Sequence, residues 1–280
     1  MASLQETKNR LNSVKSTRKI TKAMQLVSTA KIQRAKANYQ SVKEYYENVY
    51  EIFSDLIANV NDLEKLFPKN FEDKNLYIVI TSDLGLCGGY NSNVIKKLKE
   101  SVKKQDIIFV IGSKGVSSLT SQEFKLEKSF KYIGDEPNYF FANELGKEAI
   151  AKFISGEIKS IKIIYTKFIN SVNFEATDLM LLPIDKKVID KKENSNSSIT
   201  EFEPSADEVL LGILPLYLSA LIYGTMSESK LSEMSSRRMA MENASDNADE
   251  LINTLNLEYN RKRQAKITQE ITEIVAGAEN

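Results

Sequence analysis

The sequence predicts an α/β protein in which two long terminal helices form an antiparallel coiled coil and a small Rossmann-like α/β domain is inserted between them. Three observations lead to this fold class. Both ends of the 280-residue chain lack helix breakers over long stretches, and both carry apolar residues at heptad spacing. The middle contains short β-branched runs that alternate with helical segments. We expect an N-terminal helix over 1–66, an α/β domain over 74–185, a mobile polar loop over 186–206 and a C-terminal helix over 207–280.

The N-terminal segment contains no proline or glycine in its first sixty residues. A helix over residues 3–64 would be about 90 Å long at about 1.5 Å per residue, too long to be buried along its whole length in a domain of this size. Its apolar or small residues repeat at alternating intervals of three and four, which is typical of a coiled-coil seam. They are Ile32, Ala35, Tyr39, Val42, Tyr46, Val49, Phe53, Leu56, Val60 and Leu63.

The C-terminal segment behaves in the same way, since Gly224 and Gly277 are its only breakers after Pro215. A heptad-compatible series is followed by a second one in a shifted register: Met234, Met241, Ala248, Ile252, Leu255 and Tyr259, then Ile267, Ile271, Ile274 and Ala278. Neither helix is apolar enough to be stable alone, so we expect them to pair. One helix enters the middle segment and the other leaves it, which makes the pairing antiparallel.

The middle of the chain reads as a largely parallel sheet with helical connections. Strands are expected at residues 76–81, 107–111 and 161–165, where β-branched residues cluster. Helices are expected near 91–104 and over 139–154.

Composition excludes several classes of function. The chain has 38 basic and 38 acidic side chains and no histidine, which argues against a general nucleic-acid binder and excludes a Ser-His-Asp triad and a histidine metal site. The single cysteine, Cys87, excludes an internal disulfide and a Cys-rich zinc site, and a reducing compartment is expected. The longest apolar run, 209–223, is shorter than the roughly 20 residues that cross a bilayer, and no signal peptide is evident. We therefore expect a soluble intracellular protein without cofactor, metal or direct membrane insertion.

A glycine-rich turn, SDLGLCGGYN over residues 82–91, follows the first strand. Such turns can bind phosphates, but neither nucleotide-binding glycine fingerprint is present. A tight structural turn is favoured over a ligand site. Cys87 is better explained as a small buried residue than as a reactive thiol.

Positive charge is concentrated at the N-terminus. Residues 1–43 contain ten lysines and arginines against Glu6 alone, an excess of nine charges. Like charges on one helix repel each other, which favours an acidic partner surface over a merely solvated face. Arg261, Lys262, Arg263 and Lys266 add to this charge. Nucleic acid is an alternative counterpart, but base-stacking aromatic residues are absent from these stretches.

Four segments carry a resemblance to a known family. RLNSVKSTRKITKAM at 10–24 resembles the opening of the γ subunits of F-type ATP synthases, and the turn at 82–91 resembles their central S-D-x-G-L-C-G-x-x-N motif. RMAMENASDNA at 238–248 and NRKRQAKITQEI at 260–271 are similar to the two C-terminal motifs of that family. The four motifs occur in the family's order and cover essentially the full length of the chain.

The resemblance implies a non-catalytic central stalk that rotates inside a ring of three α and three β subunits and couples ATP synthesis or hydrolysis at β to proton or other ion transport. It implies that acidic catch loops of β face Arg10, Lys19, Lys22, Met24, Arg263, Gln264 and Thr268. Because antiparallel pairing brings the two stretches together, we expect all of these except Met24 at one level of the shaft. It gives the central turn a structural role for Asp83, Gly85, Cys87, Gly88 and Asn91. It also implies contacts with the ε subunit and the membrane rotor ring of c subunits, at the cytoplasmic face of the cell membrane.

Two positions depart from the family pattern. Leu84 stands where a basic residue is usual, and Met234 stands where histidine is common after Glu233. These departures leave open a specialised paralogue whose shaft drives another partner. A static coiled-coil scaffold is the second alternative, although it gives no reason for four ordered motifs. An enzyme that binds a nucleotide in the α/β domain lacks both a fingerprint and a general base. The direction of ATP turnover and the coupling ion are not readable from the sequence.

Overall fold

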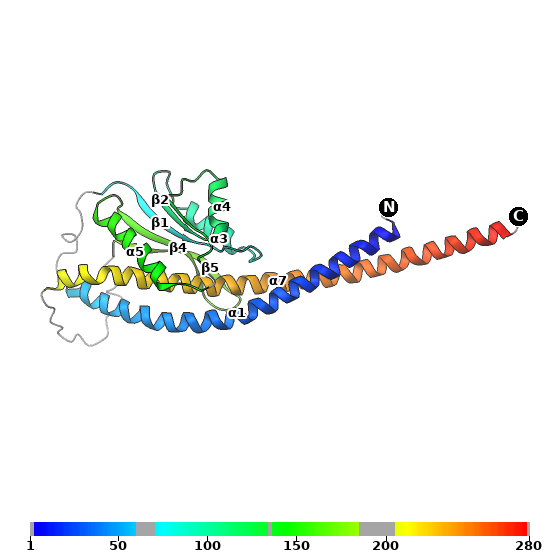
Figure 1. The fold of residues 1–280 in the computed structure, drawn as a ribbon, viewed down its shortest axis with the longest axis horizontal. Coiled ribbons are helices and arrows are strands. Elements are labelled where there is room, and N and C mark those ends of the chain that lie inside the picture. The colour runs from blue at the N-terminus through cyan, green and yellow to red at the C-terminus, as the bar shows by residue number, and fades with distance from the viewer. Residues whose placement is uncertain (1–2, 60–70, 134–135, 185–204, 279–280) are drawn as a thin grey trace. The chain divides into compact units, whose positions relative to one another are not determined.

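The computed structural model describes residues 3–59, 71–133, 136–184 and 205–278 (Figure 1). Long helices occupy both ends, and between them strands and helices alternate as far as β4, which β5 follows directly. The elements in chain order are α1 (Leu4–Asn59), β1 (Asn75–Ile80), α3 (Tyr90–Lys99), β2 (Ile107–Ile111), α4 (Ser113–Ser121), β3 (Lys128–Phe130), α5 (Tyr139–Ile154), β4 (Ser160–Phe168), β5 (Phe174–Leu182) and α7 (Ala206–Ala278).

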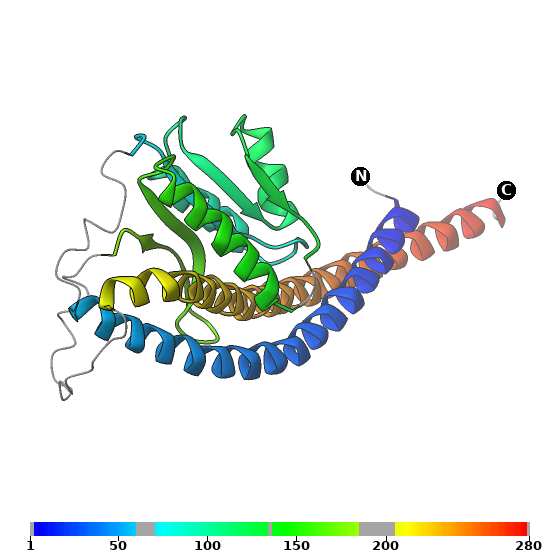
Figure 2. The ribbon, with the colours of Figure 1, turned by 60° about the vertical axis from the view of Figure 1, so that its left-hand side comes forward.

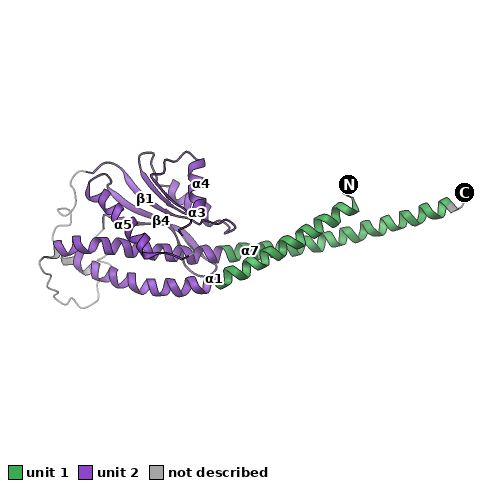
Figure 3. Cartoon of the chain, in the orientation of Figure 1, with its two compact units in different colours: residues 1–30, 237–280 green, residues 31–236 purple. Residues whose placement is uncertain are grey.

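The chain divides into two compact units (Figure 3). One unit consists of residues 1–30 and 237–280, and the other consists of residues 31–236. The α/β domain expected over 74–185 lies within the second unit, together with parts of α1 and α7.

The sheet of the second unit has the strand order β3-β2-β1-β4-β5. β1 pairs in parallel with β2 and β4, so that Ile78 lies between Phe109 and Ile163. β5 is antiparallel to β4. Every residue of β1 and β2 is buried, which explains why these strands are continuous apolar runs rather than alternating patterns. The prediction of a largely parallel sheet is confirmed.

Helices cover both faces of this sheet (Figure 2). One buried cluster joins the sheet to α1, α5 and α7, and a second joins its other face to α3 and α4. In the first cluster the rings of Phe53 and Tyr217 stack with centroids 3.8 Å apart. Among the described residues, α7 includes one stretch that is long and apolar enough to span a membrane, and 61% of that stretch is buried within the protein. Burial of this kind is typical of a core helix.

Three elements of the second unit were not predicted. α4 begins directly after Gly112, whose φ of 100° turns the chain sharply. β3 has three residues, and β5 is an edge strand with mixed burial. α3 ends at Lys99 rather than near 104, because the Asp106 carboxylate accepts the Lys103 and Asn75 backbone N–H groups at 2.7 and 2.9 Å and holds a turn there.

The coiled-coil seam predicted from Ile32 onward is confirmed as far as Leu56, because its members are buried or half-buried. Val60 and Leu63 lie outside the described residues, as do residues 186–204 of the predicted loop. The C-terminal helix α7 begins at Ala206, one residue before the predicted start.

In the first unit, α1 and α7 pair in antiparallel orientation. The Lys262 ammonium donates to Thr7 Oγ1 at 3.0 Å, and the hydroxyls of Thr21 and Ser245 are 2.8 Å apart. Leu11 and Leu255 are buried in the same seam. The predicted antiparallel pairing is confirmed for this unit.

Candidate functional site

The candidate contact residues of α1 lie on the outer surface of the helix pair in the first unit. Arg10, Lys19 and Lys22 are exposed, and Met24 is half-buried. Lys19 and Lys22 form no ion pair with the described residues of the chain. Their charge is therefore available to an external acidic group.

The candidate contact residues of α7 are exposed as well. Arg263, Gln264 and Thr268 face solvent, and the Thr268 hydroxyl is used within the helix, where it donates to the Gln264 carbonyl at 3.0 Å. The carboxylate of Glu258 lies 2.5 Å from the ammonium of Lys262, whose hydrogen bond holds the pKa of Glu258 below its ordinary value.

The expectation that all these residues lie at one level of the helix pair is wrong. Thr21 contacts Ser245, so Lys22 lies near Ser245, whereas Lys262 contacts Thr7 near the start of α1. Fifteen residues of helix separate Thr7 from Lys22, which corresponds to roughly 22 Å at about 1.5 Å per residue. The basic residues therefore form two separate levels, one around Lys19 and Lys22 and the other around Arg263.

Apolar side chains on α1 face outward at the level of Lys19 and Lys22. Ile20, Leu26 and Val27 are 60%, 63% and 57% exposed, while Thr21 and Ser28 are buried. Ile20 and Val27 stand four and three residues from Met24, and because both are exposed they do not form a packing seam that includes Met24. The helix pair presents apolar and basic side chains together on its outer surface.

The buried hydroxyls of this seam are satisfied locally. Ser28 Oγ donates to the Met24 carbonyl at 2.8 Å, and Ser245 Oγ donates to the Met241 carbonyl at 2.8 Å. An ion pair between Arg18 and Asp249, with Nε and Oδ1 2.7 Å apart, flanks the seam. Hydroxyls that bond their own helix can be buried at modest free-energy cost.

The central turn closes on itself through side-chain hydrogen bonds. The Asn91 amide oxygen accepts the Ser82 backbone N–H at 2.9 Å, and the Asn91 amide nitrogen lies 3.3 Å from Cys87 Sγ. Gly88 has a φ of 56°, in the left-handed region that favours glycine. The Cys87 side chain is buried. This geometry agrees with a tight turn.

Asp83 fixes the outer side of the same turn. Its Oδ1 accepts the backbone N–H groups of Ser113 and Tyr132 at 2.8 and 3.0 Å. Leu84 and Leu86 project outward and are 61% and 60% exposed. Gly85 has only ordinary contacts around the position of a Cβ, the nearest atom being Lys114 Cε at 3.6 Å, so its lack of a side chain is not explained by space.

A serine-rich segment of α7 covers the carboxyl ends of the strands, where α/β proteins usually bind ligands. Ser229 Oγ accepts the Thr166 backbone N–H at 3.1 Å, and Ser236 Oγ donates to the Cys87 carbonyl at 2.6 Å. Tyr90 is buried against this segment, and burial raises the pKa of its hydroxyl above the ordinary value. Among the described residues, no group of three or more acidic or cysteine side chains could hold a metal ion.

This segment was not predicted, because SESKLSEMSS at 227–236 is polar enough to resemble a solvent-exposed helix face. The usable signal was the recurrence of small serines at helical spacing, which permits close approach of backbone. Glu228 belongs to the same segment: it is buried and accepts the Phe168 backbone N–H at 2.9 Å, and burial raises the pKa of its carboxyl.

The first unit is thus an antiparallel helix pair with apolar and basic side chains on its outer surface, and in the second unit α7 packs against the carboxyl ends of β1 and β4. The chain belongs to the ATP synthase family, whose model matches residues 3–280. Within that family its relatives are γ chains.

The "ATP synthase gamma chain" of Mycoplasmopsis synoviae is 46% identical over 286 residues, which cover all of this chain and 99% of the relative. The γ chain of Mycoplasmopsis pulmonis is 42% identical over 99% of both chains. Among solved structures, a chain of the Tetrahymena thermophila mitochondrial ATP synthase central stalk and c-ring is 25% identical, with a TM-score of 0.63 over 81% of this chain and 99% of its own length. A Euglena gracilis chain at 17% identity has the same fold, with a TM-score of 0.71.

Proposed function

We propose that this γ chain is the rotor shaft of an F-type ATP synthase, with the helix pair of the first unit turning inside a ring of α and β subunits. The observation that carries the proposal is the outward placement of Ile20, Leu26 and Val27 beside Lys19 and Lys22, which form no ion pair with the described residues. Exposed apolar side chains gathered on one surface mark an interaction site.

The physical task of such a shaft is to present different contacts to successive subunits of the ring. A rigid helix pair transmits torque over tens of ångströms, and differential contacts supply the free energy that favours one conformation of each surrounding subunit. Apolar side chains suit a sliding contact, because they slip past a surface without breaking fixed hydrogen bonds.

Acidic loops of the β subunits are the proposed counterparts of the two basic levels. Lys19, Lys22 and Met24 would meet them at one level, and Arg10, Arg263, Gln264 and Thr268 at the other. The α/β domain would contact the ε subunit and the ring of c subunits. The complex is associated with the membrane, and we place this chain on its cytoplasmic face as a peripheral subunit.

The chain itself is a non-catalytic subunit, so ATP turnover is assigned to the β subunits. The central turn supports this assignment. It stands after β1, where a phosphate-binding loop would lie, but Asn91 and Asp83 accept the backbone N–H groups of Ser82 and Ser113 there. Calorimetry of the full chain with ATP and magnesium should show no tight binding. Sub-micromolar affinity would contradict the assignment.

Affinity purification from the native cell tests the shaft role. A tagged chain should recover α and β subunits in excess over itself, and single cysteines at Lys22 and at Arg263 should both crosslink to β. Recovery of other partners without α and β would favour a scaffold or a specialised paralogue. Crosslinks from Lys22 only to the membrane ring would reverse the proposed orientation.

A further inference from the structure

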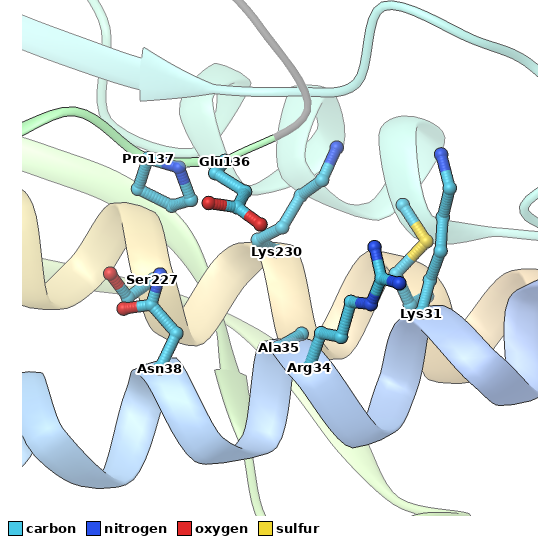
Figure 4. A pocket seen from close by; sticks show the side chains of 9 residues that line it. Lys31, Arg34, Ala35, Asn38, Glu136, Pro137, Ser227 and Lys230 are labelled. Carbon is cyan, nitrogen blue, oxygen red and sulfur yellow. The ribbon is translucent and has the colours of Figure 1, made fainter.

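A cavity in the second unit lies between α1, α7 and the segment that precedes α5 (Figure 4). Its volume is about 80 Å³, well above the roughly 10–15 Å³ that one water molecule needs. Lys31, Arg34 and Asn38 line it from one face of α1, and Ser227 and Lys230 line it from α7. The shared face follows from helical spacing, since residues three, four and seven apart point the same way.

The charge of the cavity is predominantly positive. Lys31, Arg34 and Lys230 extend their charged ends in the same general direction in Figure 4. Among the described residues, Glu136 is the one acidic side chain that lines the cavity. Lys230 also donates to Glu233 at 3.2 Å, which leaves two of the three ammonium hydrogens for another acceptor.

Ser227 supplies an independent indication of a ligand. Its residue is only 2% exposed, and its hydroxyl has no hydrogen-bond partner among the described residues. Ser28, Ser219 and Ser245, which also lie in these helices, bond a carbonyl of their own helix, whereas Ser235 in α7 also lacks a partner among the described residues but does not line the cavity. A buried hydroxyl without a partner is unfavourable, and an acceptor inside the cavity would satisfy it.

We propose that this cavity binds a phosphate group, held by the cationic side chains of Arg34, Lys31 and Lys230 and by the Ser227 hydroxyl. A tetrahedral oxyanion has enough acceptor oxygens for several of these donors, and the Asn38 amide, which lies beside Ser227 in Figure 4, can add a further N–H. Bound phosphate would join α1 to α7 at this level. The group could come from free inorganic phosphate or from a nucleotide, and the site is distinct from the central turn.

Titration of the full chain with inorganic phosphate, followed by ³¹P line broadening and calorimetry, tests the proposal. Saturable millimolar binding is expected. Arg34→Gln should weaken it about tenfold through loss of a charge-assisted contact. Ser227→Ala should weaken it about threefold or more without lowering the melting temperature measured in phosphate-free buffer, because no protein hydrogen bond is lost.

Lys36→Gln is the matched control, since Lys36 is an exposed cation on the same helix outside the cavity. Its phosphate affinity should equal that of the parent chain. Absence of saturable binding, or equal weakening by Lys36→Gln and Arg34→Gln, would overturn the proposal. Displacement of phosphate by ADP at equal or lower concentration would identify a nucleotide phosphate as the ligand, and displacement only by phosphate would identify the free ion. The readout is independent of rotation, so it can fail while the shaft role stands.

Discussion

Replacing Leu26 and Val27 by serine tests whether the outward apolar surface of α1 serves assembly rather than folding. The two side chains are 63% and 57% exposed in the chain. Full burial of such a side chain is worth about 1.5–3 kcal/mol. Because about three-fifths of each side chain is still exposed, covering it with a partner would add about 1–2 kcal/mol of binding free energy for each residue on the same scale.

The double variant should weaken binding to the α and β ring by about 2–4 kcal/mol, or roughly 30- to 900-fold in affinity. The isolated chain should lose little stability, since exposed positions usually change the free energy of unfolding by only about 0.5 kcal/mol each. The assay is reconstitution of ATPase activity from α and β subunits with increasing amounts of the chain, alongside thermal unfolding of the chain alone.

Two controls separate folding from assembly. Leu11→Ala, at a residue only 6% exposed, should lower the free energy of unfolding by about 2–5 kcal/mol. Phe140→Ser, at an exposed residue of the second unit, should alter neither stability nor reconstitution. An unchanged reconstitution midpoint in the Leu26 and Val27 double variant, or a loss of stability like that of Leu11→Ala, would refute the reasoning.

Three further predictions concern the seam, a buried carboxyl and the outer surface. Thr21→Val alone should cost about 1 kcal/mol of stability. Thr21→Val combined with Ser245→Ala should be nearly neutral, because both partners of the hydrogen bond are then removed. Chemical unfolding of the parent chain, the two single variants and the double variant measures the difference. Glu228 binds its proton more tightly in the folded than in the unfolded chain, so the free energy of unfolding should fall as the pH rises from 4.5 through its raised pKa. Glu228→Gln, which keeps an acceptor for the Phe168 N–H, should remove this slope in unfolding curves measured across that range, and an unchanged slope would exclude Glu228 as its source. Met24→Lys should leave ATP hydrolysis active but lower the ratio of ions pumped to ATP hydrolysed. An unchanged ratio with a lowered melting temperature would instead indicate that Met24 is a packing residue.

The sequence was sufficient to predict β1, β2, β4 and the terminal helices because their burial is decided locally. β1 and β2 are buried on both faces, so they are continuous β-branched runs. The seam of α1 from Ile32 to Leu56 is built from apolar side chains at heptad spacing. In both cases the residue type alone indicates the face that is covered.

The seam of the first unit could not be predicted in this way. Thr21 and Ser28 are buried although they are polar, because a hydroxyl can bond the carbonyl one turn earlier in its own helix. Leu26 and Val27 are exposed although they are apolar. In this part of α1, hydropathy therefore points to the wrong face of the helix.

The level of each candidate contact depends on the register of two helices, and neither helix specifies that register alone. Shared motifs placed Lys22 and Arg263 together, but the contact of Thr7 with Lys262 separates them. The partners of Asp83 could not be predicted from the sequence either, since Ser113 and Tyr132 follow it by 30 and 49 residues.

The burial of Cys87 has a practical consequence for spectroscopy and labelling. It is the only thiol of the chain, and it is 2% exposed beneath the bonds of Ser82, Asn91 and Ser236. A thiol reagent can reach it only when the turn opens, so the rate of modification of the unaltered protein reports the free energy of that local opening. Cysteines introduced at exposed positions such as Lys22 would react much sooner. Cys87 can therefore report local opening over long reaction times, and over short ones it contributes little labelling beside a cysteine introduced at the surface.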